Sequence, residues 1–455
     1  MAQAKFKQNL IGSGVNIVDT SGSTVRLNKL ISDKGGQGDV YHVTYRGEDY
    51  ALKWYNKQEV DVIGGDQYNT IKGLIGKCPG EEYIWPMHLV TEENPADGKM
   101  FGYLMKLLPS GYYEMQDFLK AADDPTAAHF ESYNAILTAG MNLAQAMRRL
   151  HLQGLAYKDL NPKNLMIRPK DGHVLVVDND NVSVGGSLCT VRGTRGYMAP
   201  EIVRTKYKKS PDRYTDFYSL AVILYKLFYV DHPMDGALFT KYPVCTDQVE
   251  DLLYAIKPVF QFHPTDESNR PCPGFAPNSP VRWASFPNTL REMFTDVFTE
   301  GIDTPAKRPT EQKWINVISD AKNRLILLPN GHEQFVTFDN PKTIPPRTMK
   351  LEVKTVSGIH SIAIYPRKAI FKNAIGGKTE DYSSIGAGIV YNKEANEFRI
   401  KNLTSDTWVG FSPKDGSKSQ VAPGAEYPIY DNTQILFSDD GKNKVVGKFS
   451  DLFKK

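Results

Sequence analysis

The chain has 455 residues, enough for two or three domains at roughly 100–200 residues each, with 41% apolar and 24% charged residues. This composition excludes a wholly disordered chain and a collagen-like one. The net charge of +3 comes from 55 basic and 52 acidic residues, so nothing in the charge balance points to nucleic acid as a partner.

The sequence carries no membrane or secretion signal that we recognise. The longest apolar runs, such as Leu325–Leu328, are far shorter than the roughly 20 residues that span a bilayer. The N-terminal segment Met1–Leu10 is polar and lacks the apolar core of a signal peptide. The cysteines have neither a metal-binding spacing nor a dense disulfide pattern; they are Cys78, Cys189, Cys245 and Cys272. We therefore expect a reduced, cytoplasmic protein without a membrane partner.

Strands are predicted in the first part of the chain. Residues 1–25 are rich in Gly, Ser and Thr and suggest an N-terminal lead-in, and β-prone residues then predominate from Val25 to about Val90. The segments Tyr41–Tyr45 and Tyr50–Trp54 flank Gly47, which predicts two strands joined by a turn.

Helical periodicity predominates from about Met115 to Phe228. Apolar side chains between Ile136 and Leu150 fall on one helical face, and Phe217–Phe228 predicts a second apolar helix. Residues 230–290 are rich in proline, which favours irregular structure, and helical character returns from Leu290 to Ile326.

The composition changes near residues 328–347, where Pro341, Pro345 and Pro346 indicate a linker. Beyond it, short β-prone segments alternate with turn signals, which predicts an all-β sandwich or barrel of roughly 100 residues. These segments are Ser361–Tyr365, Gly388–Tyr391, Glu397–Ile400, Thr407–Phe411 and Gln434–Phe437.

A glycine-rich segment lies between two of the predicted strands. Residues Asp33–Val40 partly match G-x-G-x-x-G-x-V, with Asp33 at the first glycine position. Glycines at this spacing let a hairpin backbone close over nucleotide phosphates, although for this segment taken alone an ordinary glycine-rich β-turn is the more common explanation. Lys53 on the following strand can neutralise phosphate oxygens, and its alternative is a solvent-exposed lysine on an edge strand.

Acidic and amide residues follow the first predicted helix. Asp159 and Asn164 lie in the segment Tyr157–Asn164, a spacing that suits a loop holding a base and a metal ligand around one site. The apolar strand Val174–Asp178 ends in an acid that is well placed to bind a divalent metal. Turn formation and loop capping are the structural alternatives for these residues.

Three further motifs complete the pattern, namely Gly193–Glu201, Tyr214–Leu220 and the Lys307-Arg308-Pro-Thr segment. In this order and at these intervals the motifs resemble the signature set of protein kinases. The resemblance covers roughly residues 25–325. It implies an α+β chain in which a bilobal protein-kinase fold is followed by a small all-β sandwich. The implied boundaries are a lead-in at 1–25, a kinase domain at 26–327 (N-terminal lobe 26–104, hinge 105–109, C-terminal lobe 110–327), a linker at 328–347 and a β-sandwich at 348–455.

The resemblance implies ATP and Mg²⁺ as cofactors and gives individual residues a role. Lys53 would bind the phosphates, and Asp159 would accept the proton of the substrate hydroxyl, with Lys163 as the basic residue of the catalytic loop. Asn164 and Asp178 would hold Mg²⁺. The implied nucleotide-binding residues, several of which also suit plain core packing, are Gly35, Gly36, Gly38, Val40, Ala51, Lys53, Met105, Lys106, Leu108 and Met166.

Three further positions match structural roles in the family. Glu201 and Arg308 match a pair that forms a salt bridge, and Asp216 would brace the catalytic loop.

The sequence also departs from the kinase pattern. Tyr157 and Lys158 stand where a histidine and an arginine usually precede the catalytic aspartate, and lysine cannot bind a phosphate bidentately as arginine does. The usual D-F-G motif is replaced by Asp178–Asp180, which has neither the Phe nor the flexible Gly. No glutamate is well placed to pair with Lys53, because the inward position of the candidate helix Asp66–Ile75 is a glutamine, Gln67.

Further residues narrow the resemblance. The segments Asp178-Asn-Asp-Asn, Ser219–Leu224, His232-Pro-Met-Asp-Gly and Asn269-Arg-Pro are similar to a bacterial, Hanks-type branch of serine/threonine kinases. Members of that branch often occur in clusters with a metal-dependent protein phosphatase and a von Willebrand factor A protein, which the resemblance implies as partners.

The C-terminal region resembles a forkhead-associated domain, a β-sandwich that binds phosphothreonine. The resemblance rests on Arg399–Val409, Pro423–Ile429 and Asn432–Phe437. The first half of the region matches poorly. A phosphopeptide site would use Lys378, Ser384 and Ser405, and the alternative is a β-sandwich without phosphopeptide binding.

Two main functions follow from these observations. The first is an active serine/threonine kinase that acts on protein substrates. The second is a pseudokinase, a nucleotide-binding or scaffolding protein whose β domain performs the recognition. A small-molecule kinase is a third possibility, which the serine/threonine-type segment Gly193–Glu201 argues against.

Overall fold

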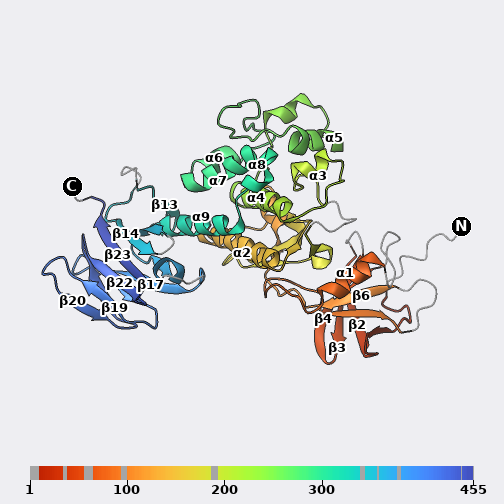
Figure 1. Cartoon of the computed structure of the whole chain (residues 1–455), viewed down its shortest axis with the longest axis horizontal. Coiled ribbons are helices and arrows are strands. Elements are labelled where there is room, and N and C mark those ends of the chain that lie inside the picture. The colour runs from red at the N-terminus through yellow and green to blue at the C-terminus, as the bar shows by residue number, and fades with distance from the viewer. Residues whose placement is uncertain are drawn as a thin grey trace. The chain divides into compact units, whose positions relative to one another are not determined.

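The computed structural model describes residues 10–33, 38–55, 65–93, 100–185, 193–338, 344–355, 358–376, 381–441 and 443–453 (Figure 1). The chain forms two compact units. The first comprises Met1–Glu131, Thr138–Val281 and Met293–Gln312, and the second comprises Ser132–Leu137, Arg282–Glu292 and Lys313–Lys455. Parts of the expected kinase region therefore cluster with the C-terminal residues.

The first unit begins with a closed barrel of strand order β1-β2-β3-β4-β6-β5. These strands are β1 (Ile17–Asp19), β2 (Thr24–Ser32), β3 (Gly38–Tyr45), β4 (Glu48–Tyr55), β5 (His88–Glu92) and β6 (Phe101–Met105). Between β3 and β4, Arg46 and Gly47 have φ angles of 51° and 84°. Positive φ at both turn residues gives a hairpin turn whose twist matches its strands, and glycine adopts it without strain. The prediction of two strands around Gly47 is confirmed.

Helix α1 (Asp66–Leu74) packs on strands of this barrel. Its buried Ile71 joins a cluster with Tyr55 of β4, Leu89 of β5 and Phe101 of β6. Apolar contacts therefore fix α1 against the strand that carries Lys53.

Helix α4 (Arg213–Tyr229) forms the centre of the helical part of the first unit, and it is buried along almost its whole length. Its first turn is closed by a capping box between Asp212 and Thr215. Helix α2 (Tyr133–Leu152) approaches it closely, since a Cβ atom on Gly140 would lie 2.7 Å from the Phe228 ring. Glycine at position 140 thus permits the contact between the two helices. Both helices match the helical segments expected from the sequence.

The remaining elements before β12 are listed here in chain order. They are β7 (Tyr113–Glu114), η1 (Met115–Leu119), β8 (Leu155–Ala156), η2 (Pro162–Asn164), β9 (Leu165–Ile167), β10 (Val174–Val176), η3 (Asn179–Asn181), β11 (Ser183–Val184), α3 (Pro200–Arg204), η4 (Ala237–Lys241), α5 (Asp247–Asp251), η5 (Leu252–Ile256), α6 (Ser279–Trp283), α7 (Asn288–Phe298), α8 (Glu300–Asp303), η6 (Pro305–Lys307) and α9 (Glu311–Arg324).

The second unit is rich in strands. They are β12 (Leu325–Leu327), β13 (Glu333–Phe335), β14 (Met349–Thr355), β15 (Gly358–Ile364), β16 (Ala369–Phe371), β17 (Ile385–Asn392), β18 (Glu397–Asn402), β19 (Trp408–Phe411), β20 (Lys418–Val421), β21 (Glu426–Ile429), β22 (Gln434–Asp439) and β23 (Lys444–Asp451), with a short helix α10 (Lys372–Ile375). One sheet has the order β15-β14-β23-β22-β19-β20 and another has the order β16-β17-β18-β21. Buried side chains of both sheets form one cluster that includes Leu351, Ile400, Trp408 and Phe449.

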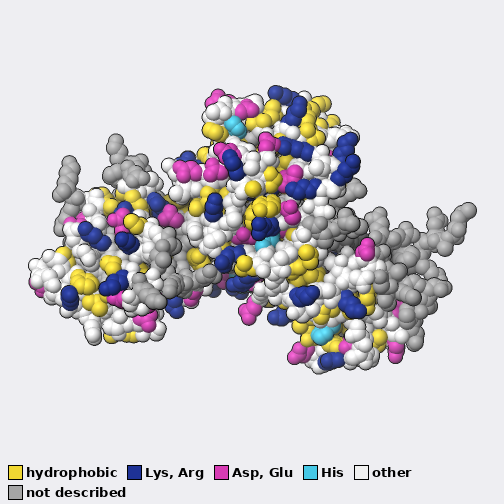
Figure 2. All heavy atoms as spheres, viewed as in Figure 1, with side chains coloured by type: hydrophobic (Ala, Val, Ile, Leu, Met, Phe, Trp, Pro, Cys, Tyr) yellow, Lys and Arg dark blue, Asp and Glu magenta, His cyan; other side chains and the backbone are white. Residues whose placement is uncertain are grey.

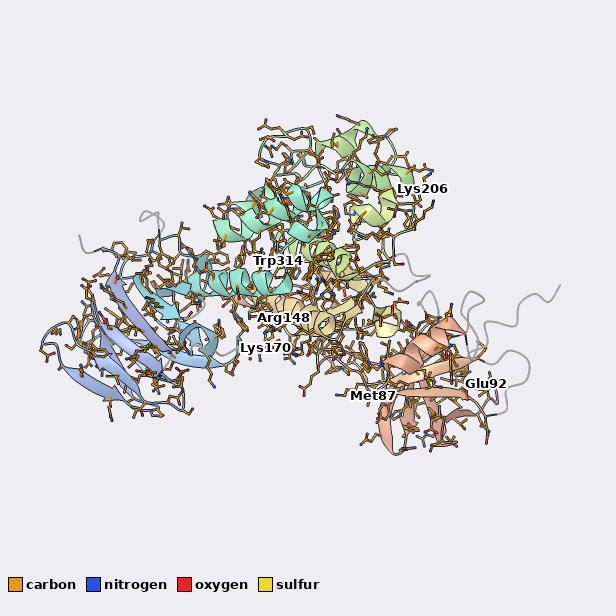
Figure 3. All side chains as sticks on the ribbon, viewed as in Figure 1. Met87, Glu92, Arg148, Lys170, Lys206 and Trp314 are labelled. Carbon is orange, nitrogen blue, oxygen red and sulfur yellow. The ribbon has the colours of Figure 1, made fainter. Side chains whose placement is uncertain are left out.

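Two polar side chains tie the ends of helices within the second unit. Glu333 of β13 accepts the backbone N–H groups of Tyr133 and Asn134 at the start of α2. The Lys368 ammonium donates to the carbonyls of Lys322, at 2.7 Å, and Leu325, at 2.5 Å, at the end of α9. These contacts supply partners for helix-end groups that the helices themselves leave unpaired. Trp314 of α9 is fully buried (Figure 3).

Three differences from the sequence expectation lie at the expected domain boundaries. Strand β1 lies inside the expected lead-in and pairs with β2 and β5, because Ile17 points into the barrel core. Leu325–Leu327 is a strand paired with β13, not the end of a helix. Strand β13 itself lies in the expected linker. A short strand next to Gly and Pro leaves little local pattern, so its long-range pairing decides the structure.

Candidate active site

Lys53 lies on β4 with its ammonium group between two carboxylates. Its Nζ atom donates to Asp178 Oδ1 and lies 2.7 Å from Asp180 Oδ2. The side chains of Lys53 and Asp180 are 10% and 0% exposed, whereas that of Asp178 is 37% exposed. The partners of Lys53 among the described residues are thus two aspartates of one segment, and neither is a glutamate of α1.

The segment after β10 is held inward by its side chains. Asp178 adopts a left-handed conformation with φ of 57°, and η3 begins at the next residue. The amide of the fully buried Asn179 donates to the carbonyls of Ile84 and Val176, at 2.9 Å each. Asn179, at the position of the usual Phe, therefore fixes the segment by hydrogen bonds instead of apolar packing.

Helix α1 contributes a neutral side chain to this site. Gln67 Nε2 donates to the Asp180 carbonyl at 3.0 Å and to the Tyr55 hydroxyl at 3.4 Å. The Tyr55 hydroxyl in turn donates to Asp180 Oδ2. The expected inward orientation of Gln67 is confirmed by these contacts.

Burial and charge act in opposite directions on this cluster. Burial alone lowers the pKa of Lys53, but attraction to Asp180 and Asp178 outweighs it and raises the pKa above its usual value. Burial together with repulsion from Asp180 raises the pKa of Asp178. For Asp180, attraction to Lys53 outweighs burial and keeps the pKa below its usual value. Asp180 is thus the more firmly ionised of the two acids.

Asp159 lies in the loop between β8 and η2. Its carboxylate accepts a hydrogen bond from the Thr194 hydroxyl at 2.7 Å, and its carbonyl accepts the side-chain amides of Asn161 and Asn164 at 3.0 Å each. Burial raises the pKa of Asp159. Lys163, four residues further on, is exposed in η2.

Buried groups hold this loop from behind. The Asp216 carboxylate accepts the backbone N–H groups of Tyr157, at 2.6 Å, and Lys158, at 3.0 Å. The Tyr157 hydroxyl donates to the Val177 carbonyl at 2.5 Å. Tyr157 thereby ties the loop of Asp159 to the strand that leads to Asp178.

The two loops are joined by one more contact. The Asn164 carbonyl accepts the Val177 N–H at 2.9 Å, next to Asp178. Lys53, Asp178, Asn164 and Asp159 therefore belong to one connected group, although they come from distant parts of the sequence. Lys53 contacts the Asp178 side chain, the Asn164 side chain contacts the Asp159 backbone carbonyl, and the backbone hydrogen bond from Val177 to Asn164 joins the two pairs.

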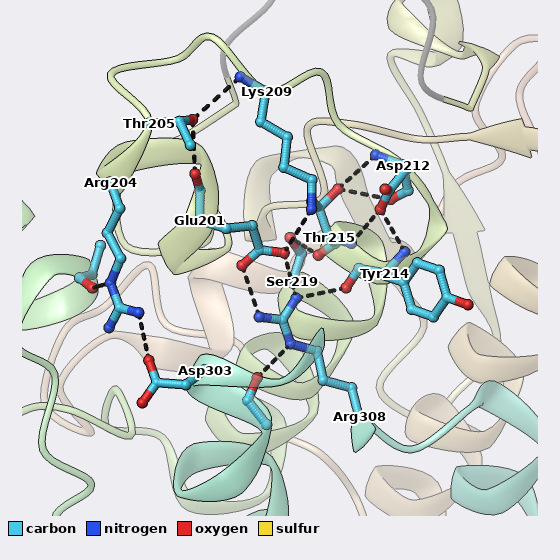
Figure 4. A network of polar contacts seen from close by, with 12 residues as sticks. Glu201, Arg204, Thr205, Lys209, Asp212, Tyr214, Thr215, Ser219, Asp303 and Arg308 are labelled. Carbon is cyan, nitrogen blue, oxygen red and sulfur yellow. Dashed lines mark hydrogen bonds and ion pairs between the residues drawn. The ribbon is translucent and has the colours of Figure 1, made fainter. Parts of the chain in front are cut away.

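The expected pair of Glu201 and Arg308 forms a bidentate salt bridge (Figure 4). Both of its hydrogen bonds measure 2.8 Å, and the Arg308 side chain is 0% exposed. Arg308 also donates to the carbonyls of Gly301 and Tyr214, at 2.8 and 2.9 Å. Attraction and hydrogen bonds from Arg308 outweigh burial and lower the pKa of Glu201.

Several of the expected nucleotide-binding residues lie on neighbouring strands of the barrel. Val40 is paired with Lys53 across β3 and β4, and Ala51 is paired with Met105 across β4 and β6. Gly38 begins β3, and Met166 lies on β9. The pairings bring Val40, Ala51 and Met105 onto the sheet that carries Lys53. Gly35 and Gly36 lie outside the described residues.

Lys106 and Leu108, which the sequence places in a hinge, follow β6 and are exposed. Lys106 also lines a cavity of about 550 Å³ together with Cys78, Trp85 and Met87.

The donor groups near Asp178 suit a divalent cation. No cluster of three His, Cys, Asp or Glu side chains with metal geometry occurs in the described part of the chain. However, the side-chain oxygens of Asn164, Asp178 and Asp180 are of the kind that Mg²⁺ prefers as ligands. Asn164 contacts the Asp159 carbonyl through its amide nitrogen, so this hydrogen bond does not use its amide oxygen. Asp180 Oδ1 is a buried oxygen without a hydrogen-bond partner among the described residues. The residues present therefore fit a metal at this place.

Sequence reasoning did not assign Asp180 to the site. It stands where kinases carry a glycine, which gives no reason to expect a functional carboxylate. The combination of a missing glutamate on α1 and an extra acid two residues after Asp178 was the signal that could have identified it.

The C-terminal candidates are separated from one another in the sequence and partly undescribed. The Ser384 N–H donates to the Asp381 carboxylate at 2.8 Å. This backbone donor of the candidate phosphate site is therefore already paired with an acidic group. Ser405 is exposed between β18 and β19. Lys378 lies outside the described residues.

Comparison with known proteins identifies the family. A sequence profile of the protein kinase domain matches residues 33–275, more than half of the chain. A probable serine/threonine-protein kinase of Dictyostelium discoideum is 27% identical over 243 residues, which is 50% of this chain and 16% of the relative. Protein kinase C delta type of Mus musculus is 28% identical over 212 residues, 45% of this chain and 29% of the relative. The PK-1 kinase structure of Cydia pomonella granulovirus is 16% identical with a TM-score of 0.42, covering 64% of this chain and 93% of that chain.

The chain therefore belongs to the protein kinase family. It spans less than a third of the length of each of the two curated relatives. No helix in the described ranges is long and apolar enough to cross a membrane. On the face drawn in Figure 2, basic and acidic side chains are interspersed, in keeping with the small net charge.

Proposed function

We propose that the protein is an ATP- and Mg²⁺-dependent serine/threonine protein kinase. The observation that supports this most directly is the connected group of Lys53, Asp178, Asn164 and Asp159. Phosphoryl transfer needs positioned charges more than covalent chemistry from the protein, and these residue types supply the required charges.

Each residue has a distinct part in the proposed reaction. Lys53 binds phosphate oxygens of ATP, and Asp159 orients the substrate hydroxyl and accepts its proton. Asn164 and Asp178 would hold Mg²⁺, which neutralises charge on the phosphates when bound. Lys163, the basic residue of the proposed catalytic loop, is exposed in η2. The hydrogen bond from Thr194 to Asp159 favours the serine/threonine type, because this threonine belongs to the segment that resembles those kinases.

A specific observation also favours a pseudokinase. The Lys53 charge is already paired with Asp178 and Asp180 within the chain, as expected for a lysine that stabilises the fold and does not bind phosphate. A nucleotide-binding scaffold would keep such a site without turnover.

Transfer of radiolabelled γ-phosphate from ATP to a generic protein substrate tests the proposal. The full-length wild type is expected to label the substrate with Mg²⁺ and to lose labelling in EDTA, and Asp159→Ala is expected to lower the rate by at least about 100-fold. Nucleotide binding is measured in parallel. Binding without labelling by the wild type would establish the pseudokinase, and equal labelling by Asp159→Ala would assign the activity to a contaminant.

We further propose that the C-terminal β-rich region is a sandwich of the forkhead-associated type that recognises proteins. The common buried cluster of its two sheets supports a sandwich. Proposed partners are a phosphopeptide, a metal-dependent phosphatase and a von Willebrand factor A protein. Calorimetry with the full chain and a peptide covering residues 183–195 tests the first. Phosphorylation at Thr190 is expected to tighten binding about tenfold, which corresponds to about 1.4 kcal/mol. Equal affinity for the phosphorylated and the unphosphorylated peptide would show that the domain does not recognise the phosphate.

A further inference from the structure

The lysine that binds phosphates in protein kinases is usually held by a glutamate of the neighbouring helix, and this ion pair must be in place for activity. In this chain the helix α1 offers Gln67 at the inward position, and its acidic residue Asp66 is exposed. Lys53 nevertheless has a buried carboxylate partner, and that partner comes from a different element.

The partner is held in place on several sides. Asp180 Oδ2 lies 2.7 Å from Lys53 Nζ and also accepts the Tyr55 hydroxyl. The Asp180 backbone carbonyl accepts Gln67 Nε2 at 3.0 Å. The preceding residue, Asn179, is bound to the Ile84 and Val176 carbonyls. Both the carboxylate and the backbone of Asp180 are therefore fixed before any nucleotide arrives.

We propose that Asp180 is the positioning residue that holds Lys53 toward the nucleotide phosphates, in place of a helix glutamate. The proposal rests on the kinase function proposed above. A buried ammonium needs a counter-charge, and the two aspartates can have separate roles, one as a metal ligand and one as the counter-charge of Lys53. Asp178 is 37% exposed and accessible to a metal ion, whereas Asp180 is 0% exposed and remains with Lys53.

This arrangement changes what α1 has to do. A helix glutamate can hold its lysine only when the helix lies close to the strand, which makes helix position a control point. Here the counter-charge is carried by the segment 178–180, and α1 supplies only the neutral Gln67. Movement of α1 is therefore expected to affect Lys53 less than in kinases with the usual pair.

The first experiment removes the charge of Asp180 and keeps its shape. Asp180→Asn is expected to lower kcat/KM for ATP about 10- to 100-fold, the effect of losing a charged hydrogen bond. It is also expected to weaken ADP binding about tenfold in EDTA, where no metal contributes. Lys72→Ala, on the exposed face of α1, is the matched control and is expected to behave as the wild type.

The EDTA condition separates two roles of Asp180. Its unpartnered Oδ1 atom would also suit a metal ligand. If Asp180→Asn weakened nucleotide binding only when Mg²⁺ is present, Asp180 would be a metal ligand and the positioning role would be overturned. Because ADP binding needs no turnover, this measurement remains valid even if the wild type shows no kinase activity.

The second experiment moves the carboxylate to the helix. In the wild-type background, Gln67→Glu places a second acid beside the Asp180 carbonyl and is expected to lower kcat/KM and ADP affinity. In the Asp180→Gly background, the same substitution supplies the missing counter-charge and is expected to raise both by at least about fivefold. A merely structural role of Asp180 does not produce this reversal of sign.

The outcome is decided by the comparison within each background, so reduced stability of one variant does not obscure it. The proposal would be overturned if the Asp180→Asn variant bound ADP as tightly as the wild type. It would also be overturned if Gln67→Glu raised neither kcat/KM nor ADP affinity in the Asp180→Gly protein. Thermal unfolding of each variant verifies that the proteins compared are folded.

Discussion

The imidazole of His151 lies between two carboxylates, with Nε2 3.0 Å from Asp216 Oδ2 and Nδ1 hydrogen-bonded to Glu311. The same Asp216 carboxylate accepts the N–H groups of Tyr157 and Lys158. A titratable group of α2 is therefore linked through one carboxylate to the loop that presents Asp159.

This relationship predicts a pH dependence of stability. Burial lowers the pKa of His151, but hydrogen bonds to Asp216 and Glu311 outweigh it and raise the pKa to about 9. Because the folded-state pKa exceeds the unfolded value of about 6.5, the stabilisation is fully present below about pH 6.5 and is lost as the pH rises through 9. Its size is at most about 3 kcal/mol.

Urea unfolding of the wild type and of His151→Gln at about pH 6 and about pH 9.5 measures this contribution. The variant is expected to be less stable at the lower pH and nearly equal to the wild type at the higher one. Parallel pH profiles of the two proteins would show that the proton on His151 contributes nothing.

The salt bridge of Glu201 and Arg308 is expected to be essential for the fold of the first unit. Arg308→Met leaves the carboxylate without its bidentate partner and is expected to cost about 3–5 kcal/mol. Lys307→Ala is the control, because its pair with Glu300 is exposed and is worth at most about 1 kcal/mol. The free energy of unfolding is the measurement, and similar losses from the two substitutions would contradict this prediction.

Asn402 is expected to organise the turn between β18 and β19. It is 0% exposed, donates to the carbonyls of Asp406, at 2.7 Å, and Val421, at 3.0 Å, and accepts the Thr404 N–H at 2.9 Å. Asn402→Ala leaves these buried groups unpaired and is expected to cost about 2–3 kcal/mol. The exposed Ser405→Ala is expected to change stability by less than about 0.5 kcal/mol. Amide hydrogen exchange in β18 and β19 would locate the loss, and unchanged protection there would refute the assignment.

Cutting the chain at the sequence boundary 327 is expected to destabilise what remains. The truncation removes Glu333, which caps the start of α2, and Lys368, which caps the end of α9. Glu333→Ala in the full chain is expected to cost about 1 kcal/mol through the first of these losses. The fragment 1–327 should therefore melt at a lower temperature than the full chain. Equal melting temperatures of the fragment and the full chain would show that Glu333 and Lys368 do not stabilise these helix ends.

The sequence predicted those elements whose pattern is local. The hairpin around Gly47 and the helix containing Phe228 follow from residue spacing alone. Strands β1 and β13 escaped prediction because pairing with distant strands fixes them. The connection of Asp159 to Asp178 could be expected only through the kinase resemblance. Asp180 was missed because its role depends on Lys53, which lies far away in the chain and whose usual partner is absent.

The hydrogen bonds of Asn179 have a consequence for inhibitors. A compound that fills space vacated by an outward turn of residues 178–180 must first separate Asn179 from the Ile84 and Val176 carbonyls and Asp180 from Lys53. Each charged or buried hydrogen bond broken without replacement costs about 1–3 kcal/mol, so such a compound loses several orders of magnitude in affinity. Selective ligands for this protein are therefore better sought among molecules that bind while residues 178–180 keep their inward conformation.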